Sequence, residues 1–256
     1  MAVPSGASYG WRARIGFIQP SAGNPNHPHE FYLLAPEGVT ISLMGLRSLE
    51  DPPEEFLSQE SLDRALRRLP AAARVLAAQP VDVIVQAGVP HVTAQPYGVE
   101  ERLKADVAAV TAIPLVIDVR ASIEALQTLG VTKALMVSPF TEGASEQVAS
   151  YVGHDGIAIV GAHRVNPGAY GGLYTLSLEA VYREVKTAYR RLGAGCDGVW
   201  LPGAAMPSVG ILDVLEGDLG VPVVSSKQAM VWAALRTAGV SLVKAGYGRL
   251  WESPRN

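Results

Sequence analysis

The chain contains 256 residues, of which 48% are hydrophobic and 18% charged, and its formal net charge is −3 at pH 7. This composition excludes an intrinsically disordered chain and a coiled coil, because both carry more charge and less apolar surface. The slight negative charge and the 7% aromatic content argue against nucleic-acid binding, so we expect no nucleic-acid partner.

The chain has one cysteine, Cys196, which can form neither an internal disulfide nor a multi-cysteine zinc site. No run reaches the ~18 apolar residues of a membrane-spanning helix. The first residues, MAVPSGASYGWRAR, lack the hydrophobic core of a secretion signal. We therefore expect a cytoplasmic protein with no membrane partner. GxxxxGK[ST] is absent, as is GxGxxG after the first strand, so no nucleotide cofactor is predicted.

Short apolar, β-branched runs alternate along the chain with stretches of helical periodicity. The predicted strands cover residues 14–18, 39–44, 81–85, 114–117, 133–137, 157–161, 198–201 and 221–224. The predicted helices cover residues 59–78, 99–110, 121–129, 142–152, 178–191 and 229–238. Continuous apolar strands are typical of parallel sheets that are covered on both faces. Their alternation with helices predicts an α/β fold with right-handed crossovers.

The two halves of the chain resemble each other in order and spacing. RARIGFIQPS is similar to KALMVSPFTE, and VDVIVQAGVP is similar to CDGVWLPGAA. We predict two pseudo-symmetric flavodoxin-like lobes with parallel sheets. Lobe 1 comprises residues 1–118 and 226–256, and lobe 2 comprises residues 119–225. Ligands bind beyond the carboxyl ends of parallel strands, which predicts an active site between the lobes at loops 19–24, 86–91, 138–143 and 202–206.

Several motifs resemble those of maleate cis–trans isomerases. YGWRARIGFIQPSAG and EFYLLAPEGVTI are similar to the start of that family, and SPFTE, SLEAVYREV, CDGVWLP and GVPVVSSKQAMVWAALRTAGV are similar to its second lobe. The family belongs to the aspartate/glutamate racemase superfamily, in which arylmalonate decarboxylase is a close branch. The resemblance covers nearly the whole chain. It implies a small carboxylate or carbonyl compound as the substrate.

The chain departs from this family at the two catalytic thiols. The resemblance implies one cysteine after the third strand of each lobe, and these positions are Gly88 and Gly203 here. Cys196 precedes its strand, at the remote end, and is predicted to be a small buried residue. We therefore predict neither double-bond isomerisation nor two-base racemisation. Arylmalonate decarboxylase keeps only the second thiol, which this chain also lacks.

Other motif positions differ as well. The asparagine of the PSSNT motif aligns with Gly23, although Asn24 is adjacent and is the candidate that replaces it. The tyrosine of SPYTE is Phe140, which removes a hydroxyl donor. Lys227 stands where the relatives have an amide in SSNQA.

Hydrogen-bond donors remain at the predicted strand ends. The backbone amides near Gly88 and Gly203 are candidates for binding a carboxylate or an enediolate. The alternative is that these glycines only permit tight turns. The full set of predicted substrate-binding residues is Ser21, Asn24, Gly88, Val89, Ser138, Phe140, Thr141, Gly203 and Ala204.

Three histidines form a second group of candidates. His27 and His29 lie in the segment HPHE after the first strand, and His91 follows the third strand. With Glu30 they match the donor set of a zinc site, but His-x-His spacing is common by chance and we predict no metal. His27 and His29 are expected on a flexible loop. His91 is the predicted proton-transfer group, because imidazole titrates near neutrality.

Two further side chains are catalytic candidates. Lys227 follows the last strand and is expected to act as a base, as a Schiff-base nucleophile or as a fixed positive charge. The alternative is a solvated lysine at a helix start. Tyr170 lies in the glycine-rich stretch 166–174, which either closes over a ligand or is a plain connection. Arg67 and Arg68 are predicted to be solvated charges on a helix face.

Two functions of different class remain open. The first is a cysteine-independent enzyme, a lyase, hydrolase or isomerase, that stabilises a carbanion or enediolate of a small carboxylate. The second is a catalytically silent member that binds a small acid. Convergence of His91, Lys227 and tyrosine hydroxyls favours the enzyme, whereas a cleft filled by Val89, Phe140 and Met206 favours the binder. We also expect a homo-oligomer.

Overall fold

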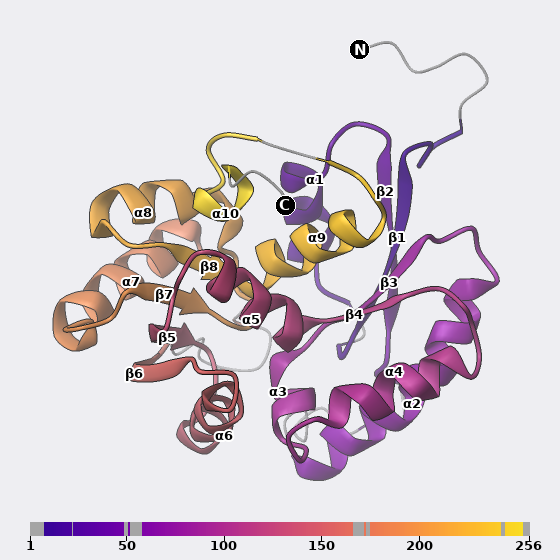
Figure 1. Ribbon diagram of the computed structural model, residues 1–256, viewed down its shortest axis with the longest axis horizontal. Helices are drawn as coiled ribbons and strands as arrows, with labels where there is room; N and C mark the ends of the chain where they lie inside the picture. Colours follow the sequence, from indigo (N-terminus) through magenta and orange to yellow (C-terminus); the bar gives the residue numbers. More distant parts are fainter. Residues whose placement is uncertain are drawn as a thin grey trace.

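The computed structural model describes residues 8–21, 23–48, 51, 58–165, 172, 175–241 and 244–252. It contains two four-stranded sheets in which the paired strands are parallel (Figure 1). The first sheet, in the order β2-β1-β3-β4, is formed by β1 (Ala13–Gln19), β2 (Val39–Gly45), β3 (Val83–Gln86) and β4 (Leu115–Ile117). The second, in the order β6-β5-β7-β8, is formed by β5 (Lys133–Ser138), β6 (Ala158–Arg164), β7 (Gly198–Leu201) and β8 (Val223–Ser225). The identical strand order confirms the predicted pair of pseudo-symmetric α/β lobes.

Helices follow each strand, as the alternating pattern predicts. The first half contains α1 (Asn26–Leu34), α2 (Gln59–Ala77), α3 (Val89–Thr93), α4 (Val99–Ala108) and α5 (Asp118–Thr128). The second half contains α6 (Glu142–Gly153), α7 (Leu178–Leu192), the 3₁₀ turn η3 (Val209–Ile211), α8 (Leu212–Leu219), α9 (Ser226–Thr237) and α10 (Arg249–Glu252). Among the described residues, no helix has the length and apolarity that crossing a bilayer requires.

Helices α5 and α9 join the two lobes. Each begins directly after the last strand of a sheet, and the two helices pack against each other between the sheets (Figure 1). Helix α9 also contacts β3, β4 and α1 of the first lobe, although the strand before it belongs to the second sheet. The chain therefore crosses between the lobes near residues 118 and 226. The lobe boundaries that we placed there stay a prediction.

One large hydrophobic core contains residues of both sheets, and a smaller core lies within the second lobe. Alternate residues of β5 face opposite sides of the second sheet, because side chains alternate along a strand. Ala134 and Met136 belong to the larger core, which also contains residues of the first lobe. Leu135 and Val137 belong to a smaller core that includes side chains of α7 and α8. The strand ends are consequently held in fixed positions relative to each other.

All the predicted strands are present, and the largest shift is the end of β6 at Arg164 rather than residue 161. Gly130, Gly195 and Gly239 lie beyond the ends of α5, α7 and α9 and have left-handed φ values of 72°, 80° and 69°. Helix α1 was not predicted, because its segment NHPHEFYLL is rich in asparagine, proline and histidine. Proline is tolerated in the first turn of a helix, and Phe31 and Leu34 bury the inner face of α1.

Candidate active site between the two lobes

The Gly88 and Gly203 turns have the same backbone conformation. Gly88 follows β3 with φ 112°, and Gly203 follows β7 with φ 109°, values that glycine adopts without strain. In each turn the residue three positions later donates its N–H to the glycine carbonyl, His91 at 3.2 Å and Met206 at 3.0 Å. The carboxyl ends of β3 and β7 thus present two equivalent turns.

The loop after β1 connects the two turns. A Cβ placed on Gly88 would lie 3.2 Å from Pro20 Cγ, so that proline sits against the first turn. Asn24 Nδ2 donates to the Ala204 carbonyl at 3.3 Å, which ties the same loop to the second turn. Helix α3, after the first turn, packs against α6 of the second lobe. The predicted loops 19–24, 86–91 and 202–206 therefore lie in one region.

Neither turn has room for a side chain at its glycine. A Cβ on Gly88 would lie 2.7 Å from His91 Nδ1, and a Cβ on Gly203 would lie 2.9 Å from Pro139 Cδ. Both distances are shorter than real Cβ contacts. In the first lobe, an imidazole nitrogen therefore occupies the space where a side chain at position 88 would begin. In the second lobe, a proline ring occupies that space.

His91 is buried beneath the first turn. Its side chain belongs to α3, and the residue is only 3% exposed. Burial lowers the pKa of His91 to about 4, and a hydrogen bond with the Gly88 backbone opposes this shift. The imidazole is therefore neutral near pH 7. It lines a small cavity together with Pro20 and Leu46.

Asp118 binds the Gly88 amide, which was predicted from the sequence to bind the substrate. The Gly88 N–H donates to Asp118 Oδ2 at 2.9 Å, and the hydroxyl of Ser122 approaches Oδ1 at 3.5 Å. Asp118 is completely buried, and burial raises its pKa to about 6 against the opposing hydrogen bonds of Gly88, Ser226, Ser122 and Val89. A carboxylate of the protein itself thus occupies the Gly88 amide, which leaves this N–H unavailable to a ligand. Sequence reasoning missed Asp118, whose only signal is a lone acid ending the apolar run LVI.

The second turn keeps its amides available. Within the described residues, no hydrogen bond engages the N–H of Gly203 or of Ala204. Both residues are partly exposed, in contrast to the buried Pro202 and Met206 on either side of the turn. The two turns therefore differ in which groups they can offer to an anion.

Lys227 is neither solvated nor part of the His91 cavity. Its Nζ lies 2.7 Å from Glu30 Oε2, and the residue is 1% exposed. Glu30 Oε1 also accepts the N–H of Ser208 at 2.6 Å and of Val209 at 2.8 Å. Burial lowers the pKa of Lys227, and the charge of Glu30 opposes this. The alternative of a solvated lysine at a helix start is therefore wrong, because the side chain forms a buried ion pair that links α9 to α1.

His27 and His29, which are both described, do not form a metal-binding group with His91. His27 is buried in α1 with its ring 5.9 Å from that of Phe17, so it does not lie on a flexible loop. Burial, and then the charge of Lys227, lower the pKa of His27. His29 is exposed. In the part of the chain that the structure describes, no three His, Cys, Asp or Glu side chains form a metal-binding group.

The remaining predicted residues have mainly local roles. Ser138 Oγ accepts the Phe140 N–H at 3.3 Å, and Thr141 is an exposed cap of α6 that accepts from Ala144 N. Ser21 is buried after β1. Tyr170 lies outside the described residues. Val89, Phe140, Met206 and the half-buried Cys196 make apolar contacts.

Comparison with known proteins identifies relatives with this architecture. Arylmalonate decarboxylase from Bordetella bronchiseptica is 26% identical over 145 residues, which cover 56% of this chain and 59% of the relative. The solved structure of unliganded arylmalonate decarboxylase matches with a TM-score of 0.81 at 22% identity, covering 94% of this chain and 99% of the other. A cysteine-to-alanine variant of the maleate isomerase Iso from Pseudomonas putida S16, solved with maleate, matches with a TM-score of 0.79 at 22% identity. This match covers 94% of the present chain and 97% of the other.

At this level of identity the solved structures establish a shared fold. The family assignment comes from the model of arylmalonate decarboxylase, which matches residues 15–251. This range runs from β1 to α10, and it confirms the resemblance that the motifs indicate. The chain therefore belongs to the arylmalonate decarboxylase family.

Proposed function

We propose that this protein is a cysteine-independent enzyme that transfers a proton at the carbon next to the carboxylate of a small acid. His91 is the proton-transfer group. One observation carries this assignment: His91 Nδ1 lies 2.7 Å from where a Cβ at position 88 would be. The resemblance places a thiol at that position in the relatives, so the imidazole takes over its place beside the substrate.

The charge state of His91 determines its part in the reaction. With a pKa of about 4 the imidazole is neutral near pH 7 and accepts a proton. The C–H bond next to the carboxylate breaks, its electrons move onto the carboxylate oxygens, and an enediolate forms. His91 then returns the proton to carbon. With a malonate-type substrate, loss of CO₂ gives the same enediolate, and the nearby dianion raises the imidazole pKa toward the protonated form that is needed.

The enediolate requires hydrogen-bond donors that are fixed in advance. The amides of Gly203 and Ala204 fit this role, because no described group accepts a hydrogen bond from either N–H. The amide of Gly88 does not, since Asp118 holds it at 2.9 Å. We assign the base to the first turn and the anion-binding donors to the second.

Deuterium exchange tests this proposal whichever overall reaction the protein catalyses. The protein is incubated in D₂O with 2-arylpropionates, succinate and phenylmalonate, and NMR follows deuterium incorporation and CO₂ release. His91→Gln keeps a polar side chain of similar reach but cannot transfer the proton. We expect it to lose about 10²–10⁴-fold in rate. The control is His29→Gln, which changes an exposed histidine of α1. Equal rates in wild type and His91→Gln would exclude His91.

The packing of the apolar residues supports a second function. Val89, Phe140 and Met206 are 0%, 5% and 1% exposed, which fits a site that binds a small acid without reaction. Such a protein would raise its melting temperature with small carboxylates but show no exchange with any of them. The cytoplasmic location and the homo-oligomer stay predictions from the sequence.

A further inference from the structure

Two asparagines at the beginning of α1 contact the second turn from the opposite lobe. Asn24 Nδ2 donates to the Ala204 carbonyl at 3.3 Å, and Asn26 Nδ2 donates to the Ala205 carbonyl at 2.9 Å. These carbonyls belong to the two residues that follow Gly203. Two consecutive peptide groups of the second turn are therefore held by side chains of the first lobe.

Glu30 extends this set of contacts along α1. Asn26 and Glu30 are four residues apart, so they lie on the same face of the helix. Glu30 Oε1 accepts the N–H groups of Ser208 and Val209 at 2.6 and 2.8 Å, and Lys227 Nζ lies 2.7 Å from the other carboxylate oxygen. Glu30 is 3% exposed, so water does not compete for these bonds. One face of α1 thus fixes the second turn and the residues that follow it.

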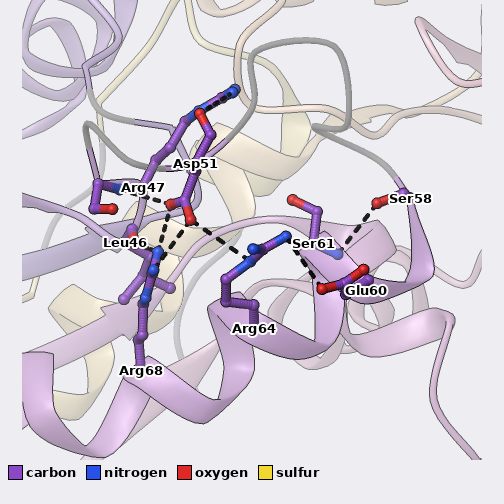
Figure 2. A network of polar contacts seen from close by, with 9 residues as sticks. Leu46, Arg47, Asp51, Ser58, Glu60, Ser61, Arg64 and Arg68 are labelled. Carbon is purple, nitrogen blue, oxygen red and sulfur yellow. Dashed lines mark hydrogen bonds and ion pairs between the residues drawn. The ribbon is translucent and has the colours of Figure 1, made fainter.

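The polar network after β2 is different, because it stays within the first lobe. Figure 2 shows Asp51 facing Arg64 and Arg68 of α2. Arg68 Nη2 lies 3.0 Å from Asp51 Oδ1, and the Ser48 N–H donates to Asp51 Oδ2 at 2.7 Å. This network joins a loop to a helix of the same sheet. The contacts of α1, in contrast, join one lobe to the other.

The contacts of α1 determine where the free amides of the second turn point. The Ala204 carbonyl and the Ala205 N–H share one planar peptide group. Only the two backbone dihedrals of Ala204 separate that group from the Ala204 N–H. Holding both the Ala204 and Ala205 carbonyls therefore restricts these dihedrals. Both polar atoms of Asn24 serve this arrangement, because its Oδ1 accepts the Asn26 N–H at 3.0 Å.

We propose that Asn26 is a positioning residue for the second turn. Its amide holds the Ala205 carbonyl and thereby the direction of the Gly203 and Ala204 N–H groups. The proposal rests on the proposed function in taking these N–H groups as the donors that bind the enediolate. Because Asn26 and the turn belong to different lobes, the donors are ordered only when α1 contacts the second turn.

The competing explanation is that these bonds only hold the lobes together. The two explanations differ in the kinetic constant that changes. The enediolate carries more charge on its oxygens than the bound carboxylate, so misdirected donors lower kcat more than they raise KM. A bond that only holds the lobes together affects stability and leaves the kcat of the folded protein unchanged.

Asn26→Asp separates the two explanations, because it replaces the amide by a carboxylate of the same shape that cannot donate to the Ala205 carbonyl. A negative charge is favourable in the first turn of a helix, so α1 should still form. In the deuterium-exchange assay described above, we expect kcat to fall about 10²-fold. KM should stay within about twofold of the wild-type value. Asn26→Gln keeps a donor and should recover part of the rate. The control is Gln79→Glu, the same kind of change at an exposed residue after α2, and it should change neither constant.

Backbone NMR of the ligand-free protein tests the positioning without any reaction. Amide order parameters of Gly203 and Ala204 should fall from the rigid value of about 0.85 toward about 0.6 in Asn26→Asp, and they should stay unchanged in Gln79→Glu. His91→Gln should abolish exchange and leave these order parameters as in the wild type. Failure of the proposed function and failure of the positioning role are therefore distinguishable.

Two results would overturn the proposal. The first is that the Gly203 and Ala204 amides of Asn26→Asp are as rigid as those of the wild type. The second is that Asn26→Asp raises KM alone or loses only the rate that its folded fraction explains. If no acid exchanges even with the wild type, the order parameters decide. If Asn26→Asp does not fold, Asn26→Ala, which also removes the donor, takes its place.

Discussion

The Gly88 turn and the Gly203 turn occupy equivalent places in the two lobes, yet they carry different chemistry. Their φ angles are 112° and 109°. His91 stands three residues after Gly88, and Met206 stands three residues after Gly203. The first turn has a titratable side chain and a closed amide, whereas the second has an apolar side chain and open amides. The difference teaches that a duplicated backbone can present a buried imidazole in one copy and open amides in the other, which is the basis of the reaction that we propose.

A buried carboxylate anchors each of these regions. Asp118 accepts the Gly88 N–H among hydroxyl neighbours, and its pKa rises to about 6 because burial removes water and no cation among the described residues compensates its charge. Glu30 accepts the N–H groups of Ser208 and Val209, just beyond the second turn, and Lys227 compensates its charge at 2.7 Å. The uncompensated carboxylate therefore binds the turn that also holds the proposed base.

Matched leucine substitutions in the two turns give the largest expected contrast. His91→Leu removes the proton-transfer group and should lower the exchange rate about 10²–10⁴-fold. Met206→Leu nearly conserves volume in a buried position and should change the rate only a few-fold, with a stability cost below about 1.5 kcal/mol. Exchange kinetics and circular dichroism measure both variants. Comparable losses of rate in both would mean that the turns do not divide the reaction.

Lys227→Met tests whether the second anchor is structural. Removing one partner of a buried ion pair leaves an uncompensated charge, so we expect a loss of about 3–5 kcal/mol in the free energy of unfolding. The double variant Glu30→Gln with Lys227→Met should recover part of this loss. Urea denaturation measures both, with the exposed Lys104→Met as a control near ±0.5 kcal/mol. A stable but inactive Lys227→Met would instead return Lys227 to the chemistry.

The sequence predicted the strands well because each is a continuous apolar run with its own local signal. It also located both glycine turns, since repeated order identified equivalent strand ends. The partners of those turns were not predictable in the same way. Glu30 and Lys227 are far apart in the chain, and no periodicity connects them.

Two predictions that were based on local composition were wrong. Arg67 and Arg68 are adjacent and were both expected to be solvated, but only Arg67 is exposed, because Arg68 lies on the face of α2 that contacts Asp51. Likewise His27 was expected on a loop, although burial of Phe31 and Leu34 folds that segment into α1. In each case tertiary contacts decided the outcome.

Asp118→Asn sharpens the contrast between the two anchors. The pKa of Asp118 is about 6 in the folded chain and near 3.8 otherwise, so the folded chain binds more protons between these values. The wild type therefore loses stability from Asp118 as the pH rises from about 4 to 6. Asparagine keeps an oxygen for the Gly88 N–H and does not titrate.

We expect the free energy of unfolding of the variant, relative to that of the wild type, to increase by up to about 3 kcal/mol between pH 4 and 6. Each pKa unit corresponds to about 1.4 kcal/mol. Above pH 6 the difference should stay constant. Unfolding curves at several pH values provide the measurement. Parallel stability profiles for the two proteins would show that Asp118 is not held with a raised pKa.

Alanine at each turn glycine gives the smallest effect and separates backbone strain from contact. Gly88→Ala and Gly203→Ala should each lower the free energy of unfolding by about 1–3 kcal/mol, because both force a positive φ on an alanine. Gly98→Ala has positive φ but nothing within 4 Å of its Cβ, so it reports strain alone. Gly143→Ala has neither problem, at the start of α6, and should be neutral or stabilising by about 0.4–1 kcal/mol.

The two turn variants should lose more unfolding free energy than Gly98→Ala does, and this additional loss measures the contacts with His91 and with Pro139. Only Gly88→Ala displaces the imidazole, so only this variant should lose exchange activity beyond what its stability explains. The Gly203 variant should retain the rate that its folded fraction allows, provided its amides keep their direction. If Gly203→Ala loses more activity than Gly88→Ala, the amide donors of the second turn contribute more to the rate than the position of the His91 imidazole does. A Gly88→Ala variant with the rate that its folded fraction allows would contradict the role of His91, because the added Cβ lies 2.7 Å from its Nδ1.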